Sequence, residues 1–324
     1  ACKILVGTHA LLEDPVGFER LGLVVVDEQH RFGVRQRNRL LGKGLQPHLL
    51  TMTATPIPRT LALSLHGDLD VSQIDELPPG RTPIKTAMLS GSSRDEAYQL
   101  IRDEVNKGQR AYVVLPLVED SEKMDLRSAV EVHRQLAEEV FPDLHVGLLH
   151  GRLASADKQS VIRSFAAGDS QVLVSTTVVE VGVDVPEASV MVIDHADRFG
   201  LAQLHQLRGR VGRGAAASHC LLINDSRNPL ARQRLEVLVR STDGFEIAEM
   251  DLRLRGPGQV LGTRQSGLPD LALASLADDG SVLEEAREEA ADILAQDPEL
   301  QDHAVLKRLL EEQRSRVTSA AQLN

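Results

Sequence analysis

Two adjacent carboxylates follow an apolar run near the start of the chain. Residues 23–26 are Leu-Val-Val-Val, and Asp27 and Glu28 come directly after them. A run rich in β-branched residues predicts a strand buried on both faces, as in a parallel sheet. Acids at the carboxyl end of such a strand lie where open α/β sheets bind ligands. There Asp27 can hold Mg²⁺, and Glu28 can orient or deprotonate a water that attacks a phosphate. The alternative is a pair of solvated acids.

A basic, glycine-rich segment later in the chain carries positive charge, opposite to that of the two carboxylates. Gln206, Arg210 and Arg213 belong to the pattern Gln-x-x-Gly-Arg-x-Gly-Arg. The three-residue spacing of the arginines predicts that they project from the same face of one helical turn. Arginine delivered by one lobe to a nucleotide on another stabilises charge that develops during phosphoryl transfer. A solvated basic helix is the alternative interpretation.

Small hydroxyl and histidine residues follow several other predicted strands. Such residues cap helices and turns without further function, and they also bind phosphate groups or relay between neighbouring sites. The residues of this kind are Thr8, His9, Thr53, Thr55, His150, Gly151, Arg152, Thr176 and Thr177, with Gly182 and Asp184 in the turn after the last of them.

Alternating strands and helices must position these residues. The pattern predicts helices over 94–106, over 126–140 and up to 167, and strands over 111–117, 145–149, 172–175 and 189–194. This alternation predicts a doubly wound parallel sheet. Apolar runs at 4–6, 23–26 and 48–52 predict the buried-type strands of an earlier α/β lobe, and the proline-rich segment 78–83 predicts a linker between the two lobes.

Composition limits the class of protein. The chain has 324 residues, a formal net charge of −11 and only two cysteines, Cys2 and Cys220. The acidic balance argues against nucleic-acid binding by bulk electrostatics, although backbone N–H groups and a few arginines can still make contacts. The cysteines indicate neither a disulfide framework nor a zinc site, and no apolar run is long enough to span a bilayer. We therefore expect a cytoplasmic protein without a membrane partner. Because the sequence opens at Ala1 almost directly into an apolar run, we also expect a piece of a longer chain.

The order of these motifs resembles the motor of superfamily 2 helicases. The matching segments are 7–9, 27–30, 53–55, 150–151, 175–184 and 206–213. The resemblance implies an α/β fold of RecA-like parallel sheets, of the P-loop NTPase helicase type, with one partial lobe and one complete lobe. In that family two lobes bind ATP and Mg²⁺ between them and nucleic acid across their tops.

The resemblance also implies roles for individual residues. It assigns catalysis to Asp27, Glu28, Gln206, Arg210 and Arg213, with Asp27 as the metal ligand. It assigns coupling of ATP to His30, Thr53, Thr55, Gly182 and Asp184. It assigns DNA contacts to Thr8, His9, His150, Gly151, Arg152, Thr176 and Thr177.

Residues 243–267 indicate which family of superfamily 2 helicases the chain resembles. From the residues alone they form a charged helix that Gly256-Pro257-Gly258 closes, followed by a loop. Together with residues 198–205 they look like the translocation motif of the RecG family, whose members remodel stalled replication forks and branched DNA. The resemblance implies that Arg253, Arg255, Arg264 and Gln265 couple lobe closure to movement of duplex DNA. A surface helix that packs on the second lobe is the alternative.

One motif of the family is absent. No Gly-x-x-x-x-Gly-Lys-Ser/Thr loop occurs anywhere in the 324 residues, so the lysine and hydroxyl that hold nucleotide phosphates and magnesium are missing. We expect upstream domains of the same protein to supply this loop and a DNA wedge, and we expect this chain alone to be inactive. The expected divisions are lobe 1 over 1–82, lobe 2 over 83–240, the translocation motif over 241–268 and carboxyl-terminal helices over 269–324.

The expected function is an ATP-dependent double-stranded DNA translocase and helicase, acting as a monomer. Its partner would be branched DNA, such as stalled forks and Holliday junctions in recombination and repair. Two alternatives remain open at this point. One is an RNA-remodelling superfamily 2 helicase, which shares the motifs but not residues 243–267. The other is a non-catalytic nucleic-acid-binding fragment.

Overall fold

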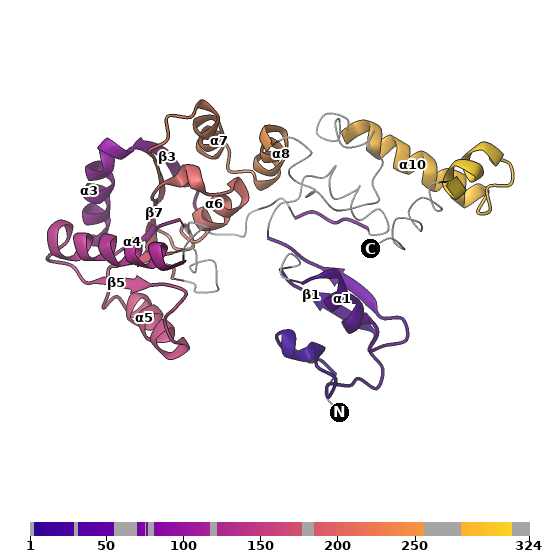
Figure 1. The fold of residues 1–324 in the computed structure, drawn as a ribbon, viewed down its shortest axis with the longest axis horizontal. Coiled ribbons are helices and arrows are strands. Elements are labelled where there is room, and N and C mark those ends of the chain that lie inside the picture. Colours follow the sequence, from indigo (N-terminus) through magenta and orange to yellow (C-terminus); the bar gives the residue numbers. More distant parts are fainter. Residues whose placement is uncertain are drawn as a thin grey trace. The chain divides into compact units, whose positions relative to one another are not determined.

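The computed structural model describes residues 3–28, 32–54, 70–74, 76, 81–116, 122–176, 185–255 and 280–312. The chain divides into two compact units, Ala1–Pro56 and Ile57–Asn324, which are drawn in Figure 1. The finer division into lobes, translocation motif and terminal helices stays a prediction. Among the described residues, no helix has the length and apolar character needed to cross a membrane.

The first unit is a small parallel α/β element. Its strands β1 (Leu23–Val26) and β2 (His48–Thr51) pair in parallel, with Leu23 opposite His48. The 3₁₀ helix η1 (His9–Leu12) precedes β1, and helix α1 (Val34–Leu41) connects the two strands. The backbone N–H of Met52 donates to Val26 O at 2.8 Å and extends the ladder past the strand ends.

The prediction that residues 23–26 form a strand buried on both faces is only half correct. Val24 and Val26 are 4% and 2% exposed, whereas Leu23 and Val25 are 57% and 51% exposed. Successive side chains of a strand point to opposite faces, so within the described residues only one face of β1 is covered. The prediction of burial on both faces is therefore wrong here.

Two further expectations for this unit need correction. Leu50 in β2 is 49% exposed, so β2 is a strand but not a buried one. Residues 4–6 are not a strand: they are irregular, and Val6 is 89% exposed. An apolar segment becomes a sheet strand only where a neighbouring strand and a covering layer take it up, and this segment is open to solvent.

The second unit contains six parallel strands in the order β3-β8-β7-β4-β6-β5. All of the pairings are parallel, and β3, the first strand of the sheet in sequence, lies beside β8, the last. The strands are β3 (Ile84–Ser90), β4 (Arg110–Val114), β5 (Val146–Leu149), β6 (Val172–Ser175), β7 (Ala188–Ile193) and β8 (Ser218–Asn224).

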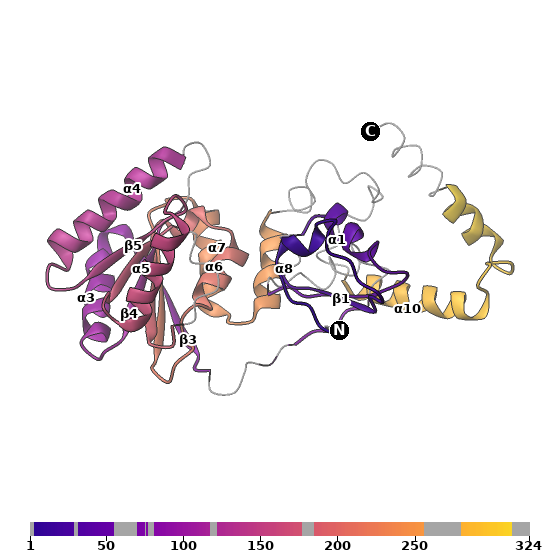
Figure 2. The same ribbon diagram turned by 90° about the horizontal axis from the view of Figure 1, so that it is seen from below.

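Helices cover both faces of this sheet, as Figures 1 and 2 show. Along β4, Ala111 and Val113 belong to a core with α3 and α4, while Tyr112 and Val114 belong to a core with α5, α6 and α7. Alternation along a strand that is buried on both faces produces these two layers. The helices are α3 (Arg94–Val105), α4 (Glu122–Gln135), α5 (Ser155–Ala167), α6 (Leu201–Arg208), α7 (Pro229–Arg240), α8 (Gly244–Arg255) and α10 (Gly280–Gln296).

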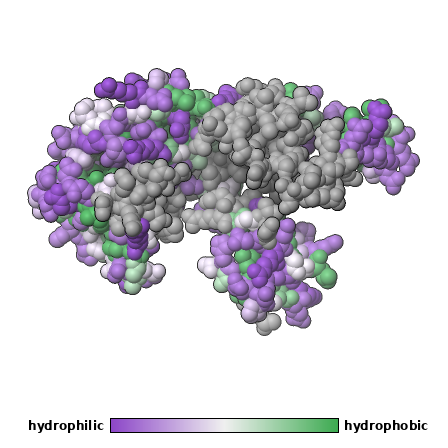
Figure 3. Space-filling view, in the orientation of Figure 1, coloured by the Kyte–Doolittle hydropathy of each residue, from purple (hydrophilic) through white to green (hydrophobic). Residues whose placement is uncertain are grey.

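The predicted doubly wound parallel sheet is confirmed. The helix expected over 126–140 is α4, which continues as a π-helical turn over Leu136–Val140. Short 3₁₀ turns over Gly91–Ser93 and Ala196–Arg198 follow β3 and β7. On the face in view in Figure 3, the described residues of the second unit are mostly hydrophilic, as expected for helices whose apolar sides face the sheet.

Candidate nucleotide and nucleic-acid sites

Asp27 and Glu28 leave the carboxyl end of β1 in a strained conformation. Asp27 Oδ1 accepts the backbone N–H of Glu28 at 2.8 Å. Glu28 has φ of 53°, in the left-handed region that non-glycine residues rarely occupy,. Asp27 is exposed, and after one backbone bond its carboxylate can still accept a cation or water. One carboxylate oxygen of Glu28 is shielded from solvent.

The neighbouring strand brings Thr53 to the same edge of the small sheet. Val26 pairs with Thr51, so both strands end at the same level, and Thr53 follows two residues later. A parallel pair therefore places the hydroxyl segment beside the two acids. His30 and Thr55, which were expected to act with them, lie outside the described residues.

A second group of predicted residues lies at the carboxyl ends of β5 and β6. Leu149 pairs with Ser175, so His150 and Thr176 follow neighbouring strand ends, and the N–H of Thr176 donates to Leu149 O at 3.2 Å. Thr176 is 2% exposed. His150 Nδ1 and Thr176 Oγ1 are both buried, and neither has a hydrogen-bond partner in the part of the chain that the structure describes.

The charges around this group are positive. Lys158 Nζ donates to Gly151 O at 2.5 Å, and Arg152 is the next residue along the chain. Burial lowers the pKa of His150 below its usual value, and the charges of Lys158 and Arg152 lower it further. The imidazole is therefore neutral near pH 7, with one ring nitrogen that can accept and one that can donate. Thr177, Gly182 and Asp184 lie outside the described residues.

The basic segment is built differently from the prediction. Helix α6 ends at Arg208, with Gly209 as its C-cap, so Arg210 and Arg213 lie in the irregular segment after the helix. The expectation that they share one helical turn is wrong. Beyond the end of the helix, Gly212 has φ of 78°, which is not helical, and a Cβ there would lie 2.9 Å from Ile84 Cγ1. A Cβ on Gly214 would lie 2.2 Å from Pro186 O, so this glycine permits a close backbone approach.

Arg208 is the buried member of this segment, and it was not singled out from the sequence. It is 3% exposed, and its Nη1 donates to Leu238 O at 2.9 Å and to Ser241 O at 2.8 Å. Its Nη2 lies 2.9 Å from His205 Nδ1. A buried guanidinium is stable only when its donors are satisfied. Arg208 thus fastens α6 to the corner between α7 and α8.

The environment of Arg208 fixes the protonation of its neighbour. Burial, and then the charge of Arg208, lower the pKa of His205 to about 4. The neutral ring can accept a hydrogen bond from the guanidinium, which a protonated ring could not do. Burial also lowers the pKa of Arg208 itself, although the group stays charged,.

Helix α8 packs directly on this corner. Ser241 Oγ donates to Glu246 Oε2 at 2.6 Å, and the N–H of Phe245 donates to Asp243 Oδ1 at 2.8 Å. Ile247 and Leu252 are 1% and 4% exposed, so the inner face of α8 is part of the core of the second unit. Among the predicted translocation residues, Arg253 is half-exposed, 3.8 Å from Glu249. The side chain of Arg255, and Arg264 and Gln265, lie outside the described residues.

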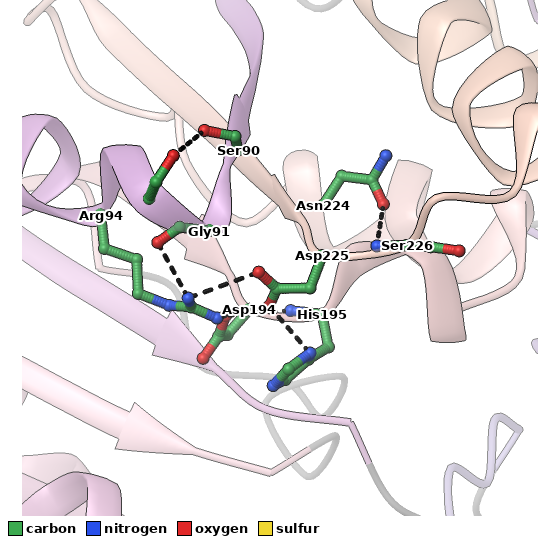
Figure 4. A network of polar contacts seen from close by, with 9 residues as sticks. Ser90, Gly91, Arg94, Asp194, His195, Asn224, Asp225 and Ser226 are labelled. Atoms are coloured by element: carbon green, nitrogen blue, oxygen red, sulfur yellow. Dashed lines mark hydrogen bonds and ion pairs between the residues drawn. The ribbon is translucent and has the colours of Figure 1, made fainter.

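A polar network joins three other strand ends of the same sheet (Figure 4). Arg94 Nη2 lies 2.7 Å from Asp194 Oδ1 and 2.6 Å from Asp225 Oδ2, and its Nη1 donates to Gly91 O at 3.0 Å. His195 Nδ1 lies 3.1 Å from Asp225 Oδ2. A Cβ on Gly91 would collide with Asp225 Oδ1, so the glycine is needed for this approach.

Sequence reasoning missed this network because its members are far apart in the chain. Asp194, His195 and Asp225 place one possible ligand atom each within 4.8 Å of one another. The Arg94 guanidinium, however, lies against both carboxylates and compensates their charge. A cation would have to displace that guanidinium, so the network is best explained as a structural clasp at the ends of β3, β7 and β8.

Two protein families match the second unit. Residues 93–215 match the helicase conserved C-terminal domain, and residues 241–323 match the family described as ATP-dependent DNA helicase RecG, domain 3, C-terminal. Arg208, within the first match, donates a hydrogen bond to Ser241 O, the first residue of the second match.

Curated relatives give the same result. The ATP-dependent DNA helicase RecG of Synechocystis sp. is 61% identical over 304 residues, which cover 94% of this chain and 37% of that protein. The RecG of Aquifex aeolicus is 51% identical over 317 residues, which cover 95% of this chain and 40% of that protein. The chain thus spans about two fifths of the length of these relatives.

Solved structures show the fold. A structure of RecG bound to a three-way DNA junction has a TM-score of 0.66 and 47% identity, and it covers 86% of this chain and 36% of that one. Mss116p bound to single-stranded RNA and AMP-PNP has a TM-score of 0.53 at 18% identity, covers 72% of this chain and 49% of that one, and shows the fold alone. The α/β arrangement described above is therefore the RecA-like helicase fold.

Proposed function

We propose that the chain is the motor portion of an ATP-dependent helicase that acts on branched double-stranded DNA, because 94% of it aligns with a bacterial RecG protein and residues 241–323 match RecG domain 3, C-terminal. One structural observation carries this proposal. Arg208 binds the segment that holds Gln206, Arg210 and Arg213 to the corner from which α8 starts. A change in the arginine segment would therefore be transmitted to the helix of the predicted translocation motif.

The acids of the first unit fit the predicted nucleotide chemistry. Asp27 is an exposed carboxylate at a strand end, the type of ligand that Mg²⁺ prefers together with waters and phosphate oxygens,. Bound Mg²⁺ would neutralise charge on the phosphates. Glu28 would orient the attacking water, and Arg210 and Arg213, with Gln206, would contact the phosphates. His30, Thr53, Thr55, Gly182 and Asp184 would relay the state of the nucleotide.

The strand ends of both units support the proposed DNA contacts. Lys158 and Arg152 place positive charge around His150, where a phosphate of the DNA backbone would be attracted,. The buried Nδ1 of His150 and Oγ1 of Thr176, which have no hydrogen-bond partner among the described residues, would become available only if the surrounding chain moved. Gly151, Thr177, Thr8 and His9 would contribute further contacts with the DNA backbone. Arg253, Arg255, Arg264 and Gln265 would couple these contacts to movement along the duplex.

The test is ATP hydrolysis by the intact protein, including its upstream part, with a three-way DNA junction, linear duplex or structured RNA as the stimulating ligand. We expect the junction to stimulate hydrolysis most strongly and to be unwound. Stronger stimulation by RNA would favour the RNA-remodelling alternative, and binding without turnover would favour the non-catalytic alternative. We expect residues 1–324 alone to show no measurable hydrolysis, because they contain no phosphate-binding loop,.

A further inference from the structure

His9 and Phe32 stack on each other in the first unit. Their ring centroids lie 4.4 Å apart, and the ring planes differ by 7°. His9 is exposed and Phe32 is half-buried. His9 belongs to the proposed DNA contacts, whereas Phe32 follows the strand that ends in Asp27 and Glu28. The stack therefore joins two segments to which different steps of the motor cycle are assigned.

The ring of Phe32 packs on His9 and not on helix α1, which begins just after it. Phe32 precedes Gly33, the N-cap of α1, whose N–H donates to Gln36 Oε1 at 2.9 Å. An apolar residue before an N-cap commonly packs on the fourth residue of the same helix. In α1 that residue is Arg37, so the helix offers no apolar side chain there, and the ring of Phe32 lies on His9.

The chemistry of the two rings divides their roles. Stacking uses the faces of the rings, whereas the nitrogens of an imidazole lie at its edge and stay available for hydrogen bonds. Phenylalanine has no hydrogen-bonding group, so it cannot itself hold a phosphate. Phe32 can fix the plane in which His9 presents its nitrogens, and an exposed histidine without such a neighbour would occupy several rotamers.

The other end of the connection is Glu28, four positions before Phe32 in the sequence. Its positive φ costs free energy, and such a conformation persists only where the surrounding structure holds it,. Glu28 and Phe32 are only four positions apart, so we expect a rearrangement at this strand end to be felt at Phe32,. The strained backbone is that of Glu28, whose carboxylate is proposed to orient the attacking water.

We propose that Phe32 is a positioning residue that couples DNA contact at His9 to hydrolysis at Glu28. This inference rests on the proposed function, because it requires an ATPase that DNA stimulates. It adds a role for a residue to which neither the motif pattern nor the proposed site gives one.

The same two segments are joined at a second place, which supplies a control. Arg39 Nη2 lies 2.6 Å from Asp14 Oδ1, with side chains 47% and 89% exposed. An exposed ion pair contributes little to stability, and neither of its residues belongs to the ring stack. Arg39→Gln removes a contact between the η1 and α1 segments but leaves the ring stack in place.

The experiment measures ATP hydrolysis by the intact protein at saturating three-way junction DNA. It compares Phe32→Ala, Phe32→Tyr, His9→Ala, the His9→Ala/Phe32→Ala double variant and Arg39→Gln. We expect Phe32→Ala to lower the stimulated rate about tenfold, the size of a lost stacking contact. Phe32→Tyr should stay within about twofold of the unsubstituted protein because it keeps the ring, and Arg39→Gln should behave likewise. The double variant should be no worse than His9→Ala, because both substitutions break one connection.

Three results would overturn the inference. The first is full stimulation in Phe32→Ala. The second is an equal loss in Phe32→Ala and Arg39→Gln, which would indicate general loosening of the unit. The third is a double variant whose loss is the product of the two single losses, which would mean that the two rings act independently. A different result, no stimulation by DNA in the unsubstituted intact protein, would contradict the proposed function instead.

Discussion

The two sheets place polar residues after the same kind of strand end but surround them differently. In the first unit, Asp27 is exposed, and half of the side chains of β1 face solvent. In the second unit, Thr176 and Arg208 are almost fully buried between helices that cover both faces of the sheet. Exposure lets a residue meet a ligand directly, whereas burial lets the protein set protonation and transmit displacement. This difference supports the proposal that the first unit acts on the nucleotide and that the second couples its state to other parts of the motor.

The strongest test of this division is Glu28→Gln in the intact protein. The substitution keeps the size of the side chain and removes the group that would orient or deprotonate water, so we expect hydrolysis to fall about 10³-fold. ATP binding should persist because Asp27 still holds magnesium. Single-turnover hydrolysis and nucleotide titration measure the two properties separately. Normal turnover would remove Glu28 from the mechanism.

The second test is the pH dependence of the buried pair in the second unit. The pKa of His205 is about 4 in the folded protein, against 6.5 for the free side chain. The unfolded chain therefore binds more protons between these values, and stability falls as the pH falls from about 6.5 to about 4. The expected loss is at most about 3 kcal/mol.

Urea denaturation at pH 7 and pH 4.5 measures this loss. His205→Gln keeps an acceptor for Arg208 but does not titrate, so the difference between the protein and this variant isolates the contribution of His205. The same pH dependence in both would mean that His205 is not the group responsible.

The third test is Arg213→Ala, which probes the arginine segment. We expect the rate of hydrolysis to fall about a hundredfold, or about 2.7 kcal/mol, because a second arginine shares the charge of the transferred phosphate. Nucleotide affinity should change far less. Arg240→Ala in α7, with a side chain 79% exposed, is the matched control. A defect in affinity alone would make Arg213 a binding residue.

The smallest expected effect concerns packing. Val192 in β7 is 2% exposed and Val25 in β1 is 51% exposed. Val192→Ala should lower the free energy of unfolding by about 2 kcal/mol, and Val25→Ala should change it by less than about 0.5 kcal/mol. Hydrogen exchange at β4 and β2, their strand neighbours, reports each loss locally. Equal losses would mean that a further layer covers β1.

Sequence patterns predicted the second unit better than the first for a physical reason. The strand expected over 189–194 is β7 (Ala188–Ile193), and its six residues are all buried, because helices supply a layer on each face. Leu23 and Val25 carry the same apolar signal, but that signal reports a preference for burial and does not show that a covering layer is present. The apolar run at 4–6 failed in the same way.

For the sites, sequence patterns misjudged how individual arginine side chains are placed. The spacing of Arg210 and Arg213 suggested a helix, but α6 ends before them at Arg208, with Gly209 as its C-cap. Glycines within a motif are also the usual signal of a chain turning. Arg208 looked like one more basic residue, because sequence does not distinguish a buried arginine from a solvated one. Arg94 pairs with Asp194 and Asp225 from 100 and 131 positions away, a distance over which no local pattern reports.

The strand order has a consequence for how this protein is made. Ile84 at the start of β3 pairs with Ser218 in β8, so β3 has no strand neighbour in this sheet until β8 has been synthesised. At synthesis rates of about 5 to 20 residues per second, that delay is about 7 to 27 seconds. During this time the apolar side chains of β3 stay uncovered on the nascent chain. We expect β3 to be the segment of the second unit that depends most on chaperones, and pulse proteolysis of stalled nascent chains would show when it becomes protected.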